Sequence, residues 1–465
     1  MSFNPINTSI LKEISQIVGS EHIFTSEGIP EKYTHDETED LCAYPEVVVR
    51  PGNTEQLSKL LKICNLNSIP VTPRGGGTGL SGGALAIYGG LMISMERFNQ
   101  IIEIDERNLQ ATVETGVITE VFMNAVAEKG FLYPVDPSSK GSCFIGGNIA
   151  HGSGGPKVVK YGTIREYVLN LEVVLPDGEV IWTGANTLKY ASGYNLTQLM
   201  IGSEGTLGIV TKAVMKLISR PAYNLVMLAS FPGNEPACEA VSAIFRAGLS
   251  PSTLEFIERR AIEWVMEYDH FQFDLKDEVQ AFLMIEVDGN NLDTLFAECE
   301  KINEVLENNS CSDVLFAESS AQKDAIWKMR RTIPLSVKSN SVYKEEDTVV
   351  PRAELPKLIQ GIKDIGSRFG FQSVCYGHAG DGNMHVNIIK GTMSDLDWNT
   401  KLKQGIREIF QLTVSLGGTI SGEHGIGSVQ REYMNIKYPE VQLNIMRGIK
   451  SVFDPKGILN PGKIF

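Results

Sequence analysis

Residues 74 to 83 read Arg74-Gly75-Gly76-Gly77-Thr78-Gly79-Leu80-Ser81-Gly82-Gly83, and six of these ten residues are glycine. Glycine loses more conformational entropy on folding than any other residue and adds no side-chain packing. A bound ligand usually compensates for this loss, because backbone N–H groups without neighbouring Cβ atoms can approach a pyrophosphate closely. The stretch therefore predicts an anion-binding loop, and a flexible surface loop is the alternative on composition alone.

The segments on either side of this loop predict an alternation of strand and helix. Residues 45–50 and 69–73 are short strand-like runs, and between them Asn53 can cap a helix with an apolar face. Residues 89–104 indicate two further strands separated by a turn. Residues 77–82 match the fingerprint G-x-G-x-x-G, but that motif must open a helix, whereas strands follow here. The pattern therefore argues against a Rossmann fold.

Two more glycine-rich stretches follow, at 142–156 (SCFIGGNIAHGSGGP) and 202–209 (GSEGTLGI). They are separated by a predicted hairpin over residues 168–183, whose turn is Pro-Asp-Gly, and a helix over about 119–129 precedes them. Three such loops in one α+β domain predict a binding site for a long dinucleotide.

The composition excludes several classes of protein. The chain has 465 residues, 42% hydrophobic and 21% charged, which is enough for two or three domains. A formal charge of −14 argues against a nucleic-acid partner. Seven scattered cysteines without a C-x-x-C pair suggest neither a disulfide framework nor an internal iron–sulfur cluster. We see no secretion signal and no apolar run near the roughly 20 residues of a membrane span, so a cytoplasmic protein is expected.

Two short stretches, 377–387 (GHAGDGNMHVN) and 421–425 (SGEHG), hold three of the seven histidines. His385 lies two residues from Asn387 in a strand-like run, so both point the same way, and the intervening turn lets His378 fold back toward them. Glycines beside Glu423 permit a bend toward the same cavity. Two imidazoles and a carboxylate are a typical ligand set for a divalent ion, zinc above all.

We therefore predict that His378, His385 and Glu423 bind a divalent metal, and we assign Asp381 to the turn or to a supporting role. Each residue also has a plainer explanation, because an isolated histidine is more often a hydrogen-bonded core residue. Only the combination favours a metal.

The glycine-rich stretches, read together, resemble a known family. PRGGGTGLSGG at 73, SCFIGGNIAHGSGG at 142, KYG at 160 and GSEGTLGIVT at 202 resemble the FAD-binding domain of the vanillyl-alcohol-oxidase (PCMH) type. GHAGDGNMHVN, SGEHGIG and LNPGK resemble its D-2-hydroxyacid dehydrogenase branch, which contains FAD-linked D-lactate dehydrogenases, glycolate oxidase flavin subunits and D-2-hydroxyglutarate dehydrogenases. The resemblance extends from about residue 40 to the end of the chain.

The resemblance implies an α+β fold in three parts. An FAD-binding domain would cover residues 1–219, with its core at about 40–219. A substrate (cap) domain with the metal site would cover residues 220–430, and residues 431–465 would return to the FAD.

The FAD is expected to be bound non-covalently. His151 stands where the family more often has another polar residue, and we interpret it as a hydrogen-bonding residue rather than a covalent tether. The residues expected to bind FAD are Arg74, Gly75, Gly76, Gly77, Thr78, Gly79, Ser81, Gly82, Cys143, Gly146, Gly147, Asn148, Gly154, Gly155, Tyr161, Glu204, Gly208, Ile209 and Asn460.

The expected chemistry is hydride transfer from a 2-hydroxyacid to the flavin. The metal would bind the substrate, and His424 would accept the hydroxyl proton. Arg330, in a W-x-x-R pattern of the family, and Lys344 are expected to bind the substrate carboxylate together with Asn387; for the two cations a solvated surface charge is the alternative. Pro334 replaces a threonine contact of the hydroxyglutarate enzymes.

A small acid, D-lactate or glycolate, is therefore the favoured substrate, with D-2-hydroxyglutarate as the alternative. A flavoenzyme of the ether-lipid synthase type and a non-enzymatic flavin or metal-binding subunit are the further alternatives. The electron acceptor would be an electron-transfer flavoprotein, a quinone, oxygen or an iron–sulfur subunit. We expect a homodimer.

Overall fold

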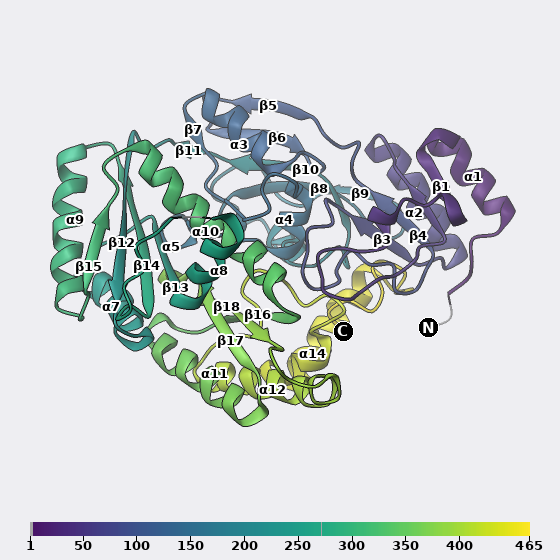
Figure 1. Ribbon diagram of the computed structural model, residues 1–465. Coiled ribbons are helices and arrows are strands. Elements are labelled where there is room, and N and C mark those ends of the chain that lie inside the picture. The colour runs from purple at the N-terminus through teal and green to yellow at the C-terminus, as the bar shows by residue number, and fades with distance from the viewer. Residues whose placement is uncertain (1–2, 271) are drawn as a thin grey trace. The chain divides into compact units, whose positions relative to one another are not determined.

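The structure is a computed structural model that describes residues 3–270 and 272–465. The chain divides into two compact units, each described separately below (Figure 1). Unit 1 contains the residues up to Ser153, Thr163–Arg220 and Glu423–Phe465, and unit 2 contains Gly154–Gly162 and Pro221–Gly422. Two segments fall outside the boundaries expected from the sequence, because 154–162 belongs to unit 2 and the returning segment begins at Glu423.

A four-stranded sheet in unit 1 carries the first glycine loop. Its strand order is β1-β2-β4-β3, and the strands are β1 (Ile23–Thr25), β2 (Val47–Val49), β4 (Leu91–Ser94) and β3 (Val71–Arg74). Helices α1 (Thr8–Val18) and α2 (Thr54–Asn67) share its apolar core. The Asn53 side chain accepts a hydrogen bond from the Gln56 N–H, which confirms the predicted cap. Strand β3 ends at Arg74, directly before the glycines.

The C-terminal residues extend this sheet. The Val71 N–H donates to the Ile458 carbonyl at 2.8 Å, and the Asn460 N–H donates to the Val71 carbonyl at 2.7 Å. The preceding helix α14 (Glu440–Phe453) buries only Leu443 along its length. The return of the C-terminus to unit 1 therefore combines backbone pairing with β3 and burial of Ile458 and Leu459 in the core of this sheet.

A second sheet in unit 1 is five-stranded and antiparallel, in the order β5-β6-β10-β8-β9. Its strands are β5 (Ile101–Asp105), β6 (Gln110–Glu114), β10 (Ile209–Lys216), β8 (Val168–Val174) and β9 (Val180–Trp182). The β8–β9 pair is the hairpin predicted at Pro-Asp-Gly. The remaining elements of unit 1 are α3 (Thr119–Glu128), β7 (Phe131–Leu132), α4 (Ile145–His151), α6 (Leu196–Met200), β11 (Ile218–Ser219) and α13 (Met434–Lys437).

One of the three expected glycine-rich loops is partly helical. Helix α4 occupies the middle of the second stretch and ends at Gly152, which has φ +71°. Two of its seven residues are glycine, which weakens a helix in isolation. Tertiary contacts override this propensity, because the Gly146 N–H donates to the Thr115 carbonyl and the Ile145 N–H to the Val117 carbonyl.

Unit 2 is built on one seven-stranded antiparallel sheet in the order β15-β12-β14-β13-β17-β18-β16. Its strands are β12 (Tyr223–Phe231), β13 (Thr253–Glu258), β14 (Ala281–Gly289), β15 (Asp313–Phe316), β16 (Tyr343–Val349), β17 (Gln372–Gly377) and β18 (Asn383–Ile389). Its helices are α5 (Val158–Tyr161), α7 (Asn234–Arg246), α8 (Arg259–Asp269), α9 (Leu292–Glu307), α10 (Ser320–Asn340), α11 (Leu355–Phe369) and α12 (Asp395–Ser415).

The two faces of this sheet carry different helices. Helices α8 and α10 pack on one face around an apolar core that includes Ile257, Phe282 and Tyr376. Helices α7 and α9 lie on the other face, and α11 packs against α7 (Figure 1). We call the first of these the α10 face, and it carries the polar residues discussed below. In the described part of the chain, no helix combines the length and the apolar character that crossing a bilayer requires.

Candidate flavin site and candidate metal site

A cavity in unit 1 is lined by residues of all three glycine-rich stretches. Of the residues predicted to bind FAD, eight line this cavity: Arg74, Gly75, Gly146, Gly147, Glu204, Gly208, Ile209 and Asn460. Sequence reasoning missed other lining residues, among them Gly83, Met95, Thr115, Met200, Ser203 and Gly205. Gly83 and Gly205 lie inside the stretches singled out, whereas Met95 and Thr115 carried no signal in the sequence.

Glycine is required where the first two stretches meet. A Cβ on Gly76 would lie 2.5 Å from the Ser142 carbonyl oxygen, and one on Gly146 would lie 2.8 Å from the Thr115 Cβ. By contrast, a Cβ on Gly147 would meet no described atom within 4 Å, and that residue lines the cavity. Some glycines thus allow the backbones to approach each other, and Gly147 leaves space for a ligand. This arrangement fits a bound dinucleotide.

The C-terminal LNPGK motif closes one side of the same cavity. The Asn460 amide donates to the Gly83 carbonyl at 3.1 Å and to the Glu204 carbonyl at 2.7 Å. Lys463 donates to the Leu85 carbonyl at 2.7 Å, and burial lowers the pKa of its ammonium group to about 8. Asn460, which the sequence predicts at the cofactor, lines the cavity, and its side chain joins two glycine-rich loops.

Several hydrogen bonds within unit 1 hold the loop that contains His424. The His424 carbonyl accepts from the Ser81 hydroxyl at 3.0 Å and from the His151 ring at 2.9 Å. The buried Glu204 carboxylate accepts from the N–H groups of Ile426 and Gly427, each at 2.7 Å. The backbone of the predicted base is therefore attached to two walls of the cavity.

His151 lines the cavity, which the sequence left open. Because its Nδ1 atom faces a carbonyl oxygen, Nδ1 must carry the proton, and Nε2 is then the unprotonated nitrogen of the neutral ring. The Nε2 atom would lie 3.5 Å from a Cβ atom added to Gly79 or to Gly83. The imidazole therefore fixes the His424 loop with one nitrogen and faces the first glycine loop with the other.

Other residues predicted to bind FAD do not line the cavity. The Tyr161 hydroxyl donates to the Asp288 carboxylate at 2.8 Å in unit 2, where Gly154 and Gly155 also belong. Cys143 is buried with its Sγ 3.2 Å from the Thr119 hydroxyl. The further residues of this kind are Gly76, Gly77, Thr78, Gly79, Ser81, Gly82 and Asn148.

In unit 2, the α10 face brings the two predicted histidine ligands together. His378 follows β17, and a 3₁₀ turn at Ala379–Asp381 leads back into β18, as the sequence predicted. The rings of His378 and His385 lie 5.3 Å apart between centroids, and both side chains are buried. A ring nitrogen of each lies within 4.8 Å of the other. The Asp381 carboxylate accepts from the Asn383 N–H at 3.2 Å, which is a turn contact.

Both imidazoles have a carboxylate beside Nδ1. His378 Nδ1 lies 2.7 Å from Glu255 Oε1, and His385 Nδ1 lies 3.4 Å from Glu345 Oε1. The Glu255 contact is a hydrogen bond and is typical of metal-binding histidines, because it leaves Nε2 of His378 as the ligand atom; the Glu345 contact is an ion-pair distance rather than a hydrogen bond to His385 Nδ1. Neither glutamate was identified in the sequence, since each is far from the histidine along the chain and no motif surrounds it.

Glu255 also holds the predicted substrate-binding arginine. Its Oε2 atom accepts from Arg330 Nε at 2.8 Å and forms an ion pair with Arg330 Nη2 at 2.6 Å. Burial alone would raise the pKa of Glu255, but His378 and Arg330 hold it at about 2. Arg330 is 3% exposed, so the alternative of a solvated surface charge does not apply to it. Its guanidinium carbon lies 5.1 Å from the centre of the Tyr376 ring.

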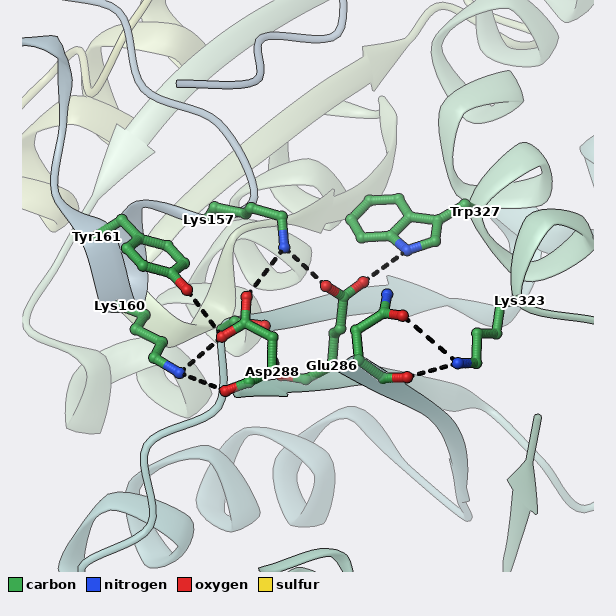
Figure 2. A network of polar contacts seen from close by, with 9 residues as sticks. Lys157, Lys160, Tyr161, Glu286, Asp288, Lys323 and Trp327 are labelled. Atoms are coloured by element: carbon green, nitrogen blue, oxygen red, sulfur yellow. Dashed lines mark hydrogen bonds and ion pairs between the residues drawn. The ribbon is translucent and has the colours of Figure 1, made fainter. Parts of the chain in front are cut away.

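Helix α10 reaches this position by bonding to three neighbouring strands in succession. Lys323 donates to the Asn224 carbonyl on β12, and the Trp327 indole donates to Glu286 on β14 at 2.9 Å (Figure 2). Arg330, one turn further on, then contacts β13. Pro334 follows, and because proline has no N–H it cannot donate to the Arg330 carbonyl. The helix therefore runs across β12, β14 and β13, and Arg330 lies beside Tyr376 of β17.

The segment 154–162 is fastened to the same sheet by charged side chains. Lys157 pairs with Glu286 at 2.7 Å, and Lys160 pairs with Asp288 at 2.7 Å (Figure 2). Glu286 therefore lies between Lys157 and the Trp327 indole, with one carboxylate oxygen on each. These contacts explain why a segment that continues from a glycine-rich stretch belongs to unit 2.

Asn387 lies on the α10 face, two residues from His385. Its side chain is fully buried, yet neither its amide nitrogen nor its amide oxygen has a hydrogen-bond partner among the residues the structure describes. The neighbouring Tyr376 hydroxyl also lacks a hydrogen bond of good geometry to the described residues, although it lies close to the Asn387 amide, and burial raises its pKa well above the ordinary value. Unsatisfied buried polar groups are rare, and a ligand is one explanation for them.

Strand register places Lys344 differently from the expectation. Lys344 pairs with Ile388 on β18, whereas Glu345 pairs with Asn387. Because side chains alternate along a strand, Lys344 points to the opposite face from Asn387 and His385. The expected contact of Lys344 with the substrate therefore finds no support in the register. Glu345 takes that place on the α10 face.

Glu423 is the first residue of the returning segment of unit 1. The preceding Gly422 donates its N–H to Asp347 Oδ2 at 2.8 Å, within unit 2. A Cβ on Gly422 would lie 2.8 Å from the Asn383 amide nitrogen, so glycine is required there. The predicted third ligand thus follows, by one peptide bond, a residue fixed beside β16 and β18.

The comparisons with known proteins agree with the two-part organisation. A model described as FAD binding domain matches residues 45–184, and one described as FAD linked oxidases, C-terminal domain, matches residues 220–464. This chain belongs to the FAD-linked oxidase family. As an FAD-linked oxidoreductase it uses FAD as its cofactor, and the resemblance predicted from the sequence is confirmed.

Curated relatives match over nearly the full length of the chain. The chain is 38% identical to the glycolate oxidase subunit GlcD of Bacillus subtilis, covering 99% of this chain and 97% of the relative. It is 36% identical to a D-lactate dehydrogenase of Anaerostipes hadrus (99% and 98%). It is 34% identical to a D-2-hydroxyglutarate dehydrogenase of Xanthomonas citri pv. viticola (97% and 96%).

Solved structures share the fold of this FAD-linked oxidase at low sequence identity. p-Cresol methylhydroxylase with bound substrate has a TM-score of 0.81 at 16% identity, covering 100% of this chain and 98% of that chain. Alkyldihydroxyacetonephosphate synthase has a TM-score of 0.76 at 18% identity, covering 99% and 86%. The predicted fold class, α+β with a PCMH-type FAD-binding domain, is confirmed.

Proposed function

We propose that this enzyme oxidises a small D-2-hydroxyacid, D-lactate or glycolate, to the corresponding 2-oxoacid. The observation that carries the proposal is the set of buried polar groups on the α10 face of unit 2. Two imidazoles, the Arg330 guanidinium and the Asn387 amide lie on one side of the sheet, in a chain whose other unit belongs to an FAD-binding family. Among its relatives are proteins named for glycolate and D-lactate oxidation.

Substrate binding would use Arg330 and Asn387. The Nε and Nη2 atoms of Arg330 face Glu255, so the Nη1 end of the guanidinium is the part left to meet a substrate carboxylate. The Asn387 amide has a donor and an acceptor available for the same molecule. These groups would orient the substrate before reaction.

A divalent metal would be held by His378, His385 and Glu423. The donor set fits, because two buried imidazoles and a carboxylate are a typical ligand set for a divalent ion, and Glu255 leaves Nε2 of His378 as its ligand atom. Glu423 would supply the third ligand, since its neighbour Gly422 is bonded to Asp347 within unit 2. When bound, the metal supplies a Lewis acid that lowers the pKa of the substrate hydroxyl. Zinc is the favoured ion.

His424 would take the hydroxyl proton as the general base. The His424 carbonyl is held by Ser81 and His151, so the imidazole moves only by rotation about its own side-chain bonds. The hydride leaves the substrate Cα with its electron pair and the proton leaves the hydroxyl oxygen, so the acid loses two electrons and two hydrogens. FAD supplies the two-electron acceptor. An external acceptor would then reoxidise it: an electron-transfer flavoprotein, a quinone or an iron–sulfur subunit.

Glu345 favours a monocarboxylic substrate. It lies on the α10 face, opposite Asn387 in register and within 3.4 Å of His385. A second substrate carboxylate in this neighbourhood would be repelled by that like charge. D-2-Hydroxyglutarate, which has two carboxylates, is therefore the less favoured substrate.

The test is anaerobic reduction of the bound flavin by a panel of acids. D-Lactate or glycolate should bleach the flavin absorbance, D-2-hydroxyglutarate should act more slowly, and L-lactate should not act. The 2-oxoacid formed is measured in the same samples. Failure of every 2-hydroxyacid to bleach FAD-loaded, metal-loaded protein would overturn the proposal.

A further inference from the structure

Glu255 lies at the centre of the α10 face and contacts two functional residues through different oxygens. Its Oε1 atom lies 2.7 Å from His378 Nδ1, and its Oε2 atom lies 2.8 Å from Arg330 Nε and 2.6 Å from Nη2. Glu255 is 0% exposed, Arg330 is 3% exposed and His378 is 4% exposed. In the chain Glu255 is 123 residues from His378 and 75 from Arg330.

The contact with His378 decides which nitrogen of that ring is available. A carboxylate only accepts hydrogen bonds, so the facing Nδ1 must carry the proton. Nε2 is then the unprotonated nitrogen, the atom through which the neutral ring would bind a metal. Without Glu255 both tautomers would be populated, and the ring could rotate about χ2.

The contact with Arg330 decides which edge of the guanidinium is available. Glu255 engages the Nε–Nη2 edge through a single oxygen, and Tyr376 lies against the guanidinium face. These contacts hold the plane of the group and direct its Nη1 end away from Glu255. A buried arginine that lost its carboxylate would leave an uncompensated charge and would move toward solvent or another anion.

We propose that Glu255 is a positioning residue that orients the metal-ligating ring of His378 and the substrate-binding guanidinium of Arg330 at the same time. This inference rests on the proposed function. One carboxylate thereby sets the geometry between the metal and the carboxylate-binding group. It links the two parts of the site that a 2-hydroxyacid would have to span.

The chain offers a matched control on the same strand. Glu258 is also buried on β13, but it lies on the opposite face, where it accepts from Asn234, Lys363 and the Cys375 N–H. Glu258→Gln removes the same charge from the same strand and touches neither His378 nor Arg330. Any effect of lost buried charge on folding should therefore appear in both variants.

The first measurement is the zinc dissociation constant of protein stripped of metal, by competition with a chromophoric chelator. Glu255→Gln should weaken zinc binding about 10- to 100-fold, as is typical for loss of the group that orients a histidine ligand. Glu258→Gln should leave it unchanged. In steady-state assays Glu255→Gln should also raise KM, through Arg330, and Glu255→Asp, which keeps the charge, should recover part of both losses.

The second measurement uses the wild-type chain and does not depend on a variant that folds. In protein labelled with ¹⁵N-histidine and loaded with zinc, the His378 ring should show a protonated Nδ1 and a metal-bound Nε2. His378→Gln identifies the signal. A metal-bound Nδ1, or equal zinc affinities for Glu255→Gln and Glu258→Gln, would overturn the inference.

The two proposals fail in different ways. If the wild-type protein binds no zinc or is not reduced by any hydroxyacid, the proposed function fails and Glu255 has no ligand to position. If the wild-type protein binds zinc and is reduced normally, while Glu255→Gln matches its control, only the role of Glu255 is refuted.

Discussion

The two candidate sites are built from opposite materials. The cavity of unit 1 is bounded by backbone and by glycines, and some of those glycines are required because two segments approach closely, as at Gly146 and Gly205. The α10 face of unit 2 is built from buried ionisable side chains, each held by another one, as in the Glu255–Arg330 pair. The first kind of site is defined by the side chains it lacks, and the second by partners that must all be present.

This difference predicts that the two sites respond differently to substitution. A lost metal ligand in unit 2 should remove a function outright, because the buried charges around it lose their balance. A methyl group added to a cavity glycine of unit 1 should reduce the affinity for FAD without abolishing binding, because it only fills space. Four substitutions test this contrast.

His378→Ala should have the largest effect. Without one of two imidazole ligands the protein should lose bound metal, and reduction of the flavin by D-lactate should fall to the background of heat-denatured protein. Bound FAD should remain at the wild-type ratio, because the FAD-binding family matches unit 1. Metal analysis and the absorbance spectrum are measured on one sample. Wild-type metal content in this variant would refute the ligand assignment.

His424→Ala tests the residue whose backbone is held in unit 1 and whose imidazole is assigned to the chemistry. Flavin reduction should slow by about 10²- to 10⁴-fold, as expected for loss of a general base. The backbone contacts of Ser81 and His151 do not involve the imidazole, so FAD and metal content should not change. Stopped-flow reduction under anaerobic conditions measures the rate. An undiminished rate would assign proton removal to another group.

Gly147→Ala tests the cavity itself. Its Cβ would meet no described atom within 4 Å, so the fold should tolerate it, and alanine favours helix α4. FAD affinity should nevertheless fall by about 5- to 150-fold, because a methyl group that fills ligand space costs about 1–3 kcal/mol. Thermal unfolding and FAD titration of the apoprotein report the two effects separately.

The matched control is Gly448→Ala in helix α14, which also has open space around its Cβ. It should raise the free energy of unfolding by about 0.5–1 kcal/mol without altering FAD affinity. Equal FAD affinities for the two variants would show that Gly147 does not face the cofactor.

Glu345→Gln should have the smallest effect and concerns selectivity. Removing one like charge at the α10 face should favour a second substrate carboxylate by about 1 kcal/mol, or about fivefold. The ratio of kcat/KM for D-lactate to that for D-2-hydroxyglutarate should therefore fall by that factor. Lys344→Met, on the other face of β16, is the control and should leave the ratio unchanged. An unchanged ratio in Glu345→Gln would show that the charge of Glu345 does not determine the preference for a monocarboxylic substrate.

Much of the fold could be predicted from the sequence because its signals are local. The Asn53 cap, the β8–β9 hairpin and the return of His378 toward His385 all follow from residues within about ten positions of each other. Helix α4 was not expected, because its glycines oppose a helix and tertiary contacts, among them those with Thr115 and Val117, stabilise it.

The site residues divide along the same line. Glycine clusters mark a cavity in the sequence because each glycine is rare and conformationally costly, so their grouping needs a cause. Lys344 was expected at the site from the family resemblance, because the sequence does not reveal which of two adjacent residues faces the site. Strand register decides that, and a shift of one residue reverses it.

Short motifs are sufficient to identify the family, the cofactor and the pair of histidines that face each other. The contacts of Glu255 with His378 and Arg330, and the position of residues 154–162 in unit 2, are visible only in the folded chain. A buried charge must be balanced by whichever opposite charge the fold brings into contact. Those partners come from strands and helices that have no fixed spacing along the chain.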